Sequence, residues 1–490
     1  MIASFKLNSD LVIYKLVLRT LSFLIFISLG SNAFAQYEKL IPDTGGNYCS
    51  IDSIILEGNK ITRDQIILRE IIFNEGDTLL NDRLDSLISR SRENLLNTLL
   101  FNFVEISKSY PFSDSAHVVI DVHVTERWYI WPRPILKISD RNFNVWWETM
   151  DFSRLSYGVY IDWQNFRGRK ETLTTQLQFG YNQVVSLKYL IPYINKKKTL
   201  GIGIGTGYSR QRETAYQTVY NKQQFFKEEE EFARQDIYAY GQFLVRRDIY
   251  NTHFFELRYD KHKFSDSLLI ENEHYTSDGE TNSQYISFKY IFKSDHRDFK
   301  SYPLKGYYFD FEILKHGLWT FQNNTLNTFH LMGTFRKYWE LHPRVYFASG
   351  INGKLSTGTQ PYFILRGIGY DRDIVRAYEY YLVDAQHFVI LKNNIKFAII
   401  PTQVKNISFI KTEKFGKIFY ALYMNVFFDG GFGIYNQDFG WETNDLQNTL
   451  LIGYGAGLDF VTYYDVVVRL EFSVNFKNEA GIFLHFMAPI

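Results

Sequence analysis

Residues 466–477 read VVVRLEFSVNFK and alternate between apolar and polar side chains with a period of two. This period predicts a β-strand, because successive side chains of a strand point to opposite faces of its sheet. The apolar face carries Val466, Val468, Leu470, Phe472, Val474 and Phe476. The other face carries full charges at Arg469, Glu471 and Lys477. A polar barrel lumen accepts such charges, whereas the core of a soluble β-sandwich excludes them.

The same alternation recurs upstream as far as Trp131, for example in Leu173–Phe179 and Tyr307–Ile313. Residues 131–490 allow about 22 residues for each of 16 strands, close to what membrane strands and their connections need. Aromatic residues make up 18% of the chain and gather in clusters typical of membrane interfaces, at Trp128–Trp131, Trp146–Trp147 and Tyr378–Tyr381. We therefore predict a mainly β protein with a 16-stranded antiparallel transmembrane β-barrel over residues 131–490. A soluble β-sandwich is the alternative.

Residues 1–35 have the pattern of a signal peptide. Basic residues precede the apolar segment Leu21–Leu29, and Ala33 and Ala35 form a small-x-small cleavage site. An uncleaved anchor is the alternative. Residues 36–49 are predicted to be a linker. The single cysteine excludes an intrachain disulfide, and the formal net charge of +1 gives no electrostatic case for nucleic acid.

A small α/β domain is predicted over residues 50–126. A strand at Ile51–Leu56 ends at the turn pair Gly58 and Asn59, and Thr62 with Gln65 has the spacing of a capping box. The expected elements that follow are a helix to Glu70, a helix over Asn81–Leu100, and strands at Phe103–Lys108 and His117–Val124. Their order is β-α-α-β-β.

The lengths of the connections in the barrel predict its orientation. Short connections are expected on the side of the small domain, at 165–169, 195–198, 250–252, 341–344 and 462–465. The long polar connections 209–233, 263–281 and 354–385 would then lie on the other side. The long span 402–417 does not fit this scheme.

Several motifs resemble those of the BamA/TamA outer-membrane superfamily. Residues Ile54–Glu70, IILEGNKITRDQIILRE, resemble the opening of its POTRA domain, and Asn165–Leu173 resembles an early barrel hairpin. Residues 295–306 are similar to its barrel turn D-x-R-D…Y-P-x-x-G, through Asp295, Arg297, Asp298, Tyr302, Pro303 and Gly306. Residues 427–431 match its F-x-D-x-G strand through Phe427, Asp429 and Gly431, and residues 453–458 resemble its G-x-G-x-G-L strand.

In this family a V-R-G-[FY] motif tips a long outer loop that folds back into the lumen. Here Val375, Arg376, Ala377 and Tyr378 occupy its place, so the resemblance implies that residues 354–385 fold inward. It also implies that Arg376 pairs with acidic residues of the wall. Asp429 is the expected partner, and Glu379 or Glu471 could contribute, because a luminal guanidinium without a carboxylate is costly. Ala377 departs from the family's glycine. Arg366, or an exposed loop arginine without a wall partner, are the alternatives to this assignment.

No motif for catalysis, cofactor binding or a metal site is present, so we predict that the protein is not an enzyme. A seam is expected between a first strand within Ile135–Trp147 and a last strand over 481–487, which includes Gly481, Leu484 and Phe486. Such an edge could pair with an incoming strand. The small domain would offer a further sheet edge near Phe103–Lys108 or Ile51–Leu56.

The resemblance implies a protein that assists insertion, assembly or translocation of client proteins at a bacterial outer membrane. The single POTRA-like unit, expected in the periplasm, suggests a specialised role. The implied partners are the lipid bilayer, unfolded β-barrel or surface-protein clients, and periplasmic or lipoprotein accessory subunits. A passive or gated solute pore is the alternative, and a barrel-embedded lipase is a third class without an identifiable triad.

Overall fold

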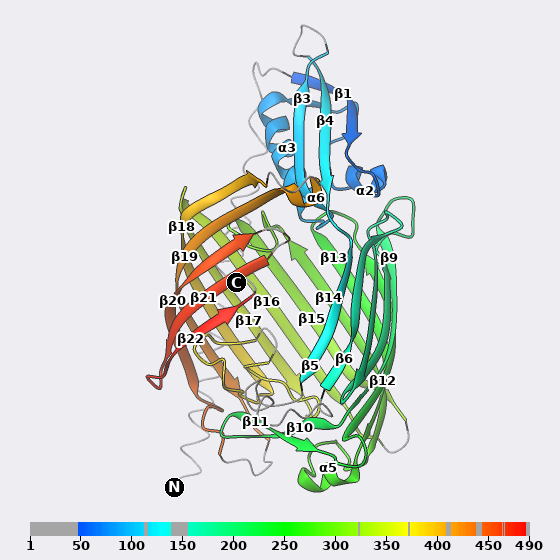
Figure 1. The fold of residues 1–490 in the computed structure, drawn as a ribbon, viewed down its shortest axis with the longest axis vertical. Helices are drawn as coiled ribbons and strands as arrows, with labels where there is room; N and C mark the ends of the chain where they lie inside the picture. The colour runs from blue at the N-terminus through cyan, green and yellow to red at the C-terminus, as the bar shows by residue number, and fades with distance from the viewer. Residues whose placement is uncertain are drawn as a thin grey trace.

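The computed structural model describes residues 48–486, except 112–115, 139–154, 322–323, 371–372, 408–412, 438–442, 463 and 465. A small N-terminal domain stands on one end of a large β-barrel (Figure 1). The predicted signal peptide, Trp146–Trp147 and the chain end from Met487 lie outside the described residues. In the described part, no helix is long and apolar enough to cross a membrane.

The N-terminal domain is a four-stranded sheet with strand order β2-β1-β4-β3, where β1 and β4 are parallel. Helix α3 packs on β3, and buried side chains from both helices and the sheet, such as Ile51, Ile67 and Leu95, form one apolar core. The elements are β1 (Tyr48–Glu57), α2 (Asp64–Leu68), β2 (Thr78–Leu80), α3 (Asn81–Leu96), β3 (Phe101–Ser109) and β4 (His117–Glu126).

Three predictions for this domain need correction. Strand β2, only three residues long, was not predicted, and it makes part of β1 an interior strand. The second helix ends at Leu96 instead of Leu100. The capping box is absent: the helix N-cap is Arg63, and the Thr62 hydroxyl instead contacts Tyr129 and Asn165.

The turn pair Gly58 and Asn59 lies where it was expected. Gly58 has a φ of +87°, and the Asn59 amide donates to the Thr62 carbonyl and the Asp64 carboxylate, at 3.0 and 2.6 Å. Asn59 therefore anchors the start of α2.

The barrel is one 16-stranded sheet in which each strand pairs antiparallel with its neighbour in the chain, apart from the local hairpin β10–β11. Its strands are β5 (Ile130–Ile138), β6 (Leu155–Phe166), β7 (Glu171–Gly180), β8 (Gln183–Ile191), β9 (Leu200–Gln211), β12 (Arg234–Val245), β13 (Asn251–Phe264), β14 (Asn282–Asp295), β15 (Gly306–Thr320), β16 (Thr328–His342), β17 (Val345–Thr357), β18 (His387–Asn406), β19 (Lys417–Ile434), β20 (Leu450–Thr462), β21 (Val466–Asn475) and β22 (Ala480–His485).

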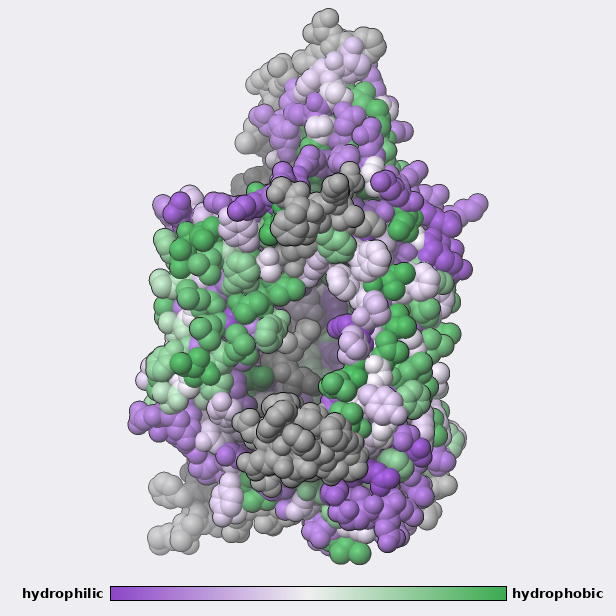
Figure 2. Space-filling model, in the orientation of Figure 1, coloured by the Kyte–Doolittle hydropathy of each residue, from purple (hydrophilic) through white to green (hydrophobic). Residues whose placement is uncertain are grey.

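The alternation of the strands separates a lipid face from a luminal face. In β21, Leu470 and Phe472 are about half exposed, whereas Arg469, Glu471 and Ser473 are buried inside the barrel. Figure 2 shows an apolar belt around the middle of the barrel, with hydrophilic residues gathered at both ends. This pattern suits a wall that faces hydrocarbon outside and polar groups inside.

The connections follow the predicted orientation. The short turns after β6, β8 and β12 contact the N-terminal domain, through Gly168, Lys198 and Asp248 in that order. The opposite end carries the long connections, which hold unpredicted structure: the hairpin β10 (Glu213–Val219) and β11 (Lys222–Lys227), and helix α5 (Asp266–Glu271). The inward loop begins after Thr357, because residues 354–357 belong to β17.

The span 402–417 is long because it reaches the N-terminal domain. Strands β18 and β19 extend beyond the rest of the wall, and α6 (Glu413–Gly416) lies beside β4 (Figure 1). Lys417 lies 3.3 Å from the Glu105 carboxylate, and the ring of Phe415 packs near that of Trp128. The first strand, β5, begins at Ile130, earlier than the predicted Ile135–Trp147, and the last strand ends at His485.

A charge on the lipid face should destabilise the barrel more than the same charge in the lumen. Leu177 faces outward and its neighbour Gln176 faces inward on β7. We expect Leu177→Arg to lower the free energy of unfolding by up to about 2–4 kcal/mol, and Gln176→Arg to change it little. Urea titration of the protein refolded into lipid vesicles would measure both. Equal losses would contradict the assigned faces.

Candidate functional site

The loop between β17 and β18, residues 358–386, folds into the barrel and packs on its inner wall. Ile368, Val375 and Val383 of the loop form an apolar cluster with the wall residues Ile390 and Leu451. Ile368 and Val383 also pair with each other as an isolated bridge. The loop therefore has a core of its own within the lumen.

The tip of this loop places Arg376 against the wall strand β19. Its Nε atom donates to Oδ2 of Asp429 at 2.8 Å, and its Nη2 atom donates to Oδ1 at 2.6 Å. The backbone N–H of Arg376 also donates to Asp429, at 3.3 Å. Both side chains are almost fully buried, at 2% and 0% exposure. A two-pronged ion pair of this kind fixes orientation as well as distance.

Three further groups surround the Arg376 guanidinium. Glu471 of β21 accepts from Nη1 at 3.4 Å, and the carbonyl of Asn393 accepts from Nη2 at 3.3 Å. The ring of Phe427 lies 3.8 Å from the guanidinium carbon, as in a cation–π contact. Every face of the buried cation therefore meets a carboxylate, a carbonyl or an aromatic ring.

Two wall glycines make room for the loop. A Cβ on Gly431 would lie 2.4 Å from the Val375 side chain, and one on Gly453 would lie 1.8 Å from the Arg376 carbonyl oxygen. The glycine motifs of β19 and β20 thus serve close approach of the loop backbone. Ala377 has a φ of +75°, a conformation that suits glycine better.

The other candidates near the loop have different contacts. Arg366 is exposed and bonds the carbonyl of Leu365, so it is not the buried luminal arginine. Tyr378 is buried in the loop core. Glu379 lies beside His485 of β22.

The barrel turn over 295–306 forms at the end that carries the N-terminal domain. Arg297 makes a two-pronged ion pair with Asp295, and the Asp298 carboxylate accepts from two backbone N–H groups of the turn. Tyr302 is buried in the lumen, where its hydroxyl donates to Asp459 at 2.6 Å. Pro303 is also buried, and Gly306 opens β15 with a φ of +97°.

The two ends of the barrel sheet form the predicted seam. Among the described residues, β5 and β22 share no ladder, and β22 pairs only with β21. Gly481 lies opposite Ser473 and Leu484 opposite Leu470, while Leu484 and Phe486 are exposed on the outer face. Figure 1 shows β5 and β22 as the two ends of the sheet on the side facing the viewer, and the surface in Figure 2 is hollowed on this side.

A buried ion-pair network joins the N-terminal domain to the barrel. The Glu70 carboxylate, just after α2, accepts from Arg246 at 2.7 and 2.9 Å, and Lys170 and Arg69 lie 3.7 Å from it. Burial alone would raise the pKa of Glu70, but these cations, Arg246 first, lower it to about 2. Nothing in the sequence pattern pointed to this network, because 176 positions separate Glu70 from Arg246.

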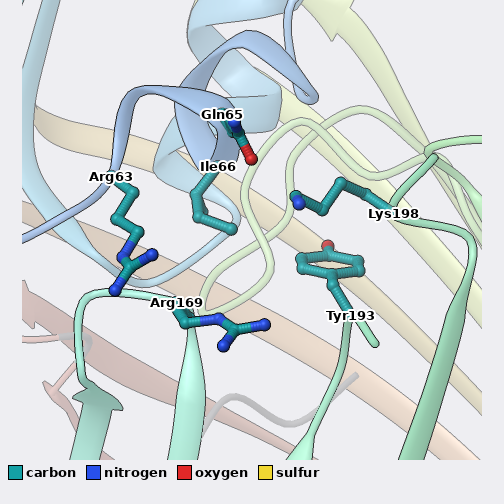
Figure 3. A pocket seen from close by; sticks show the side chains of 6 residues that line it. All are labelled: Arg63, Gln65, Ile66, Arg169, Tyr193 and Lys198. Atoms are coloured by element: carbon teal, nitrogen blue, oxygen red, sulfur yellow. The ribbon is translucent and has the colours of Figure 1, made fainter. Parts of the chain in front are cut away.

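A pocket of about 180 Å³ lies beside this network (Figure 3). The cations Arg63, Arg169 and Lys198 line it together with Gln65, Ile66 and Tyr193. The pocket spans α2 and two barrel turns, so it belongs to the junction of the two parts.

Comparison with known proteins agrees with both parts of the molecule. Residues 50–127 match the family model POTRA, described as a surface antigen variable number repeat. CdiB from Escherichia coli has a similar fold, with a TM-score of 0.50 at 10% identity over 89% of this chain and 75% of that chain. BamA from Haemophilus ducreyi lacking POTRA domains 1–3 is less similar, with a TM-score of 0.47 at 15% identity over 91% of this chain and 84% of that chain. CdiB from Acinetobacter baumannii also has a TM-score of 0.47, at 10% identity over 90% of this chain and 74% of that chain. No curated protein matches the chain.

The POTRA match is followed directly by a 16-stranded antiparallel sheet. In fold, the chain is similar to CdiB, and its residues 50–127 match the POTRA family. This confirms the predicted resemblance and the predicted fold class.

Loss of Arg376 should leave a buried carboxylate without its partner. We expect Arg376→Ala to cost about 3–5 kcal/mol of unfolding free energy, and Arg366→Ala to cost little. The exchange of charges in Arg376→Asp with Asp429→Arg should recover part of the loss. Urea titrations of the wild type, the two single exchanges and the double exchange measure the coupling. Its absence would remove Asp429 as the partner.

Loss of Glu70 should loosen the POTRA domain from the barrel. We expect Glu70→Gln to weaken docking by about 3 kcal/mol, because Arg246 loses its counter-ion. Since the pKa of Glu70 is lowered in the folded protein, its stabilisation is complete above about pH 4.5 and fades as the pH falls toward 2. Hydrogen exchange of the Arg63 N–H, which bonds Gly168, reports docking. Asp85→Asn, in the more exposed Lys108–Asp85 pair within the POTRA domain, is the control that should not accelerate exchange.

Proposed function

We propose that this protein assists the insertion or translocation of client proteins at an outer membrane, with the seam between β5 and β22 as the place of strand addition. The observation that carries the proposal is the missing ladder between these two strands in the described part of the chain. Every other barrel strand in this part has two partners.

An unpaired strand edge in hydrocarbon is costly, because its N–H and C=O groups find no water. Strand β22 is six residues long and bonds to β21 over residues 469–474 alone. A client strand that pairs with such an edge satisfies these groups and gains its own ladder. Its folding in lipid can then supply the driving force without a nucleotide.

The POTRA domain offers a second edge for a client or an accessory subunit. Strand β3 is the outer strand of its sheet, which fits the expected edge near Phe103–Lys108. The other expected edge, Ile51–Leu56, lies beyond the short β2, but the N–H groups of Ile51 and Ile54 already donate to Asp77 and Glu75. The network around Glu70 holds this domain over the barrel end (Figure 1), so a bound segment would be delivered near the lumen.

This role places the barrel in an outer membrane, with the POTRA domain in the periplasm. The apolar belt provides the contact with the bilayer (Figure 2). The client would be an unfolded β-barrel or surface protein.

A passive or gated solute pore is the second candidate, and the polar lumen favours it. The loop 358–386 speaks against a permanently open pore, because its buried core packs on the wall. A short bismaleimide bridge between Asn352→Cys of β17 and Asp373→Cys of the loop, whose side chains are hydrogen-bonded at 2.6 Å, can lock this loop in a Cys49→Ser background. Ion conductance that persists in the locked protein would favour the pore.

Joining the two seam strands should stop client insertion without unfolding the barrel. Cysteines at Leu136 of β5 and Ile482 of β22, both exposed on the outer face, can be bridged by a flexible bismaleimide in a Cys49→Ser background. We expect insertion of a β-barrel client into vesicles to fall to the level of protein-free vesicles. The matched control bridges Leu458→Cys and Leu470→Cys, which already face each other in one ladder. Full activity of the bridged seam would rule out a lateral gate.

Depletion of the protein in its host, followed by quantitative proteomics of the outer membrane, tests the role itself. Selective loss of other β-barrels or surface proteins is the expected result and would name the clients. An unchanged proteome with altered solute uptake would instead support the pore.

A further inference from the structure

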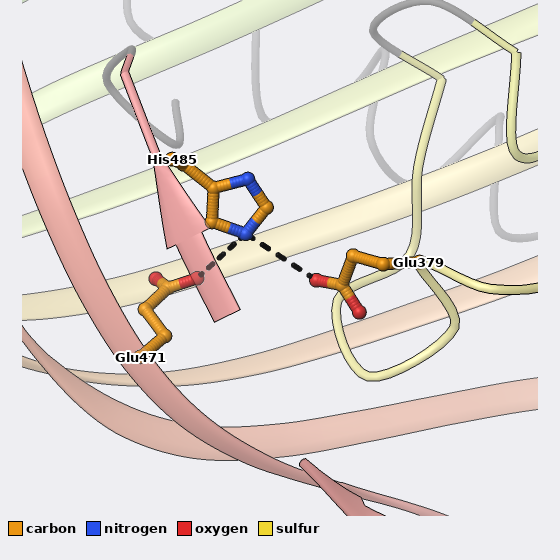
Figure 4. A group of neighbouring side chains, drawn as sticks. All are labelled: Glu379, Glu471 and His485. Carbon is orange, nitrogen blue, oxygen red and sulfur yellow. Dashed lines mark ion pairs between the residues drawn. The ribbon is translucent and has the colours of Figure 1, made fainter. Parts of the chain in front are cut away.

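Three side chains with metal-binding donor atoms meet at the inner face of the seam. Glu379 comes from the inward loop, Glu471 from β21 and His485 from the last strand β22 (Figure 4). Nε2 of His485 lies 3.6 Å from Oε1 of Glu379 and 3.7 Å from Oε2 of Glu471. All three donor atoms lie within 4.8 Å of one another.

The donor atoms that converge here are buried and lack hydrogen bonds. Both carboxylate oxygens of Glu379, Oε2 of Glu471 and Nε2 of His485 have no hydrogen-bond partner. Glu471 is only 1% exposed, and its free oxygen points toward the other two side chains. Buried polar atoms without partners are rare and costly, so this arrangement indicates a group that completes it.

The arginines of the lumen do not complete it. Arg376 is occupied by Asp429, and the contacts that Arg376 and Arg469 make with Glu471 use the other oxygen, Oε1. Within the described residues, the only ion pair of Glu379 is with His485. Oε2 of Glu471 and both carboxylate oxygens of Glu379 are therefore left without a guanidinium partner.

We propose that Glu379, Glu471 and His485 form a binding site for a divalent transition-metal ion. Two carboxylates and one imidazole are a donor set that suits Zn²⁺ and its neighbours in the first row. Two ligands of a tetrahedral Zn²⁺ lie roughly 3.3 Å apart, given metal–ligand distances near 2 Å. The two imidazole–carboxylate distances, 3.6 and 3.7 Å, are close to this value, and the two carboxylates lie within 4.8 Å of each other. Small movements of the Glu379 and Glu471 side chains toward a shared ion would complete three ligand positions and leave a fourth for water.

The ion would tie three elements together: the inward loop, the wall strand β21 and the edge strand β22. Because β22 has only one neighbouring strand, this bond would hold it from the luminal side. The binding site itself does not depend on the proposed function, since it follows from the three side chains alone.

Zn²⁺ binding to the full chain tests the site directly. The protein is purified in detergent without a polyhistidine tag, stripped with a chelator, and titrated with Zn²⁺ by calorimetry. We expect one Zn²⁺ per chain, and a higher temperature of unfolding with Zn²⁺ than with chelator. Ca²⁺ and Mg²⁺ at the same concentration should not compete, because an imidazole favours the transition metals.

His485→Gln and Glu379→Gln should each abolish this stoichiometric binding and the thermal shift. Glu379 lies in the loop, outside every strand ladder, so its variant keeps the barrel hydrogen bonds even if the change in β22 harms folding. His123→Gln removes an exposed histidine that also neighbours a carboxylate, that of Glu57, and should leave binding unchanged.

No stoichiometric binding by the folded wild-type protein would overturn the proposal. Binding that survives both variants, or that His123→Gln removes, would also overturn it.

Discussion

A guanidinium inside a narrow barrel must meet a carboxylate, and the contact between Arg376 and Asp429 satisfies this requirement. The pair needs the loop to reach β19, so Val375 and the Arg376 carbonyl press against wall positions where only glycine fits. It also needs an aromatic face and a second acid, which Phe427 and Glu471 provide. The motifs of β19, β20 and β21 are thus parts of one packing arrangement around a single buried cation.

Buried ion pairs hold the N-terminal domain at the junction and the inward loop in the lumen. At the junction, Glu70 is the buried acid and the barrel supplies the cations, which fixes a domain to a rim. In the lumen, Arg376 is the buried cation and the wall supplies the acids, which fixes a loop to a strand. Neither of these two ion pairs involves a residue of β5 or β22. The edge of β22 is therefore the part of the sheet with the fewest bonds to break.

Much of the fold could be predicted because the period of the strands is a local signal. The alternation in residues 466–477 gives the lipid and luminal faces directly, and the barrel wall repeats it. The pairing of Arg376 with Asp429 was predicted from a family motif, because the alternation within a strand does not indicate which distant carboxylate contacts the arginine. Glu70, Arg246 and His485 carry no such signal, as single charged residues far apart in the chain. At Thr62 a local signal gave a wrong prediction. Its spacing to Gln65 suits a helix cap, but its hydroxyl instead forms hydrogen bonds with Tyr129 and Asn165.

Ala377 gives the luminal loop a further property. A residue other than glycine in the left-handed region carries roughly 1–2 kcal/mol of backbone strain, and Ala377 directly follows the arginine that holds the loop in place. The Arg376–Asp429 ion pair therefore holds the Ala377 backbone in a conformation that would relax if the ion pair were broken. Separation of Asp429 from Arg376 would therefore also release the backbone strain at Ala377. This release would offset part of the free energy needed to move the loop away from the wall.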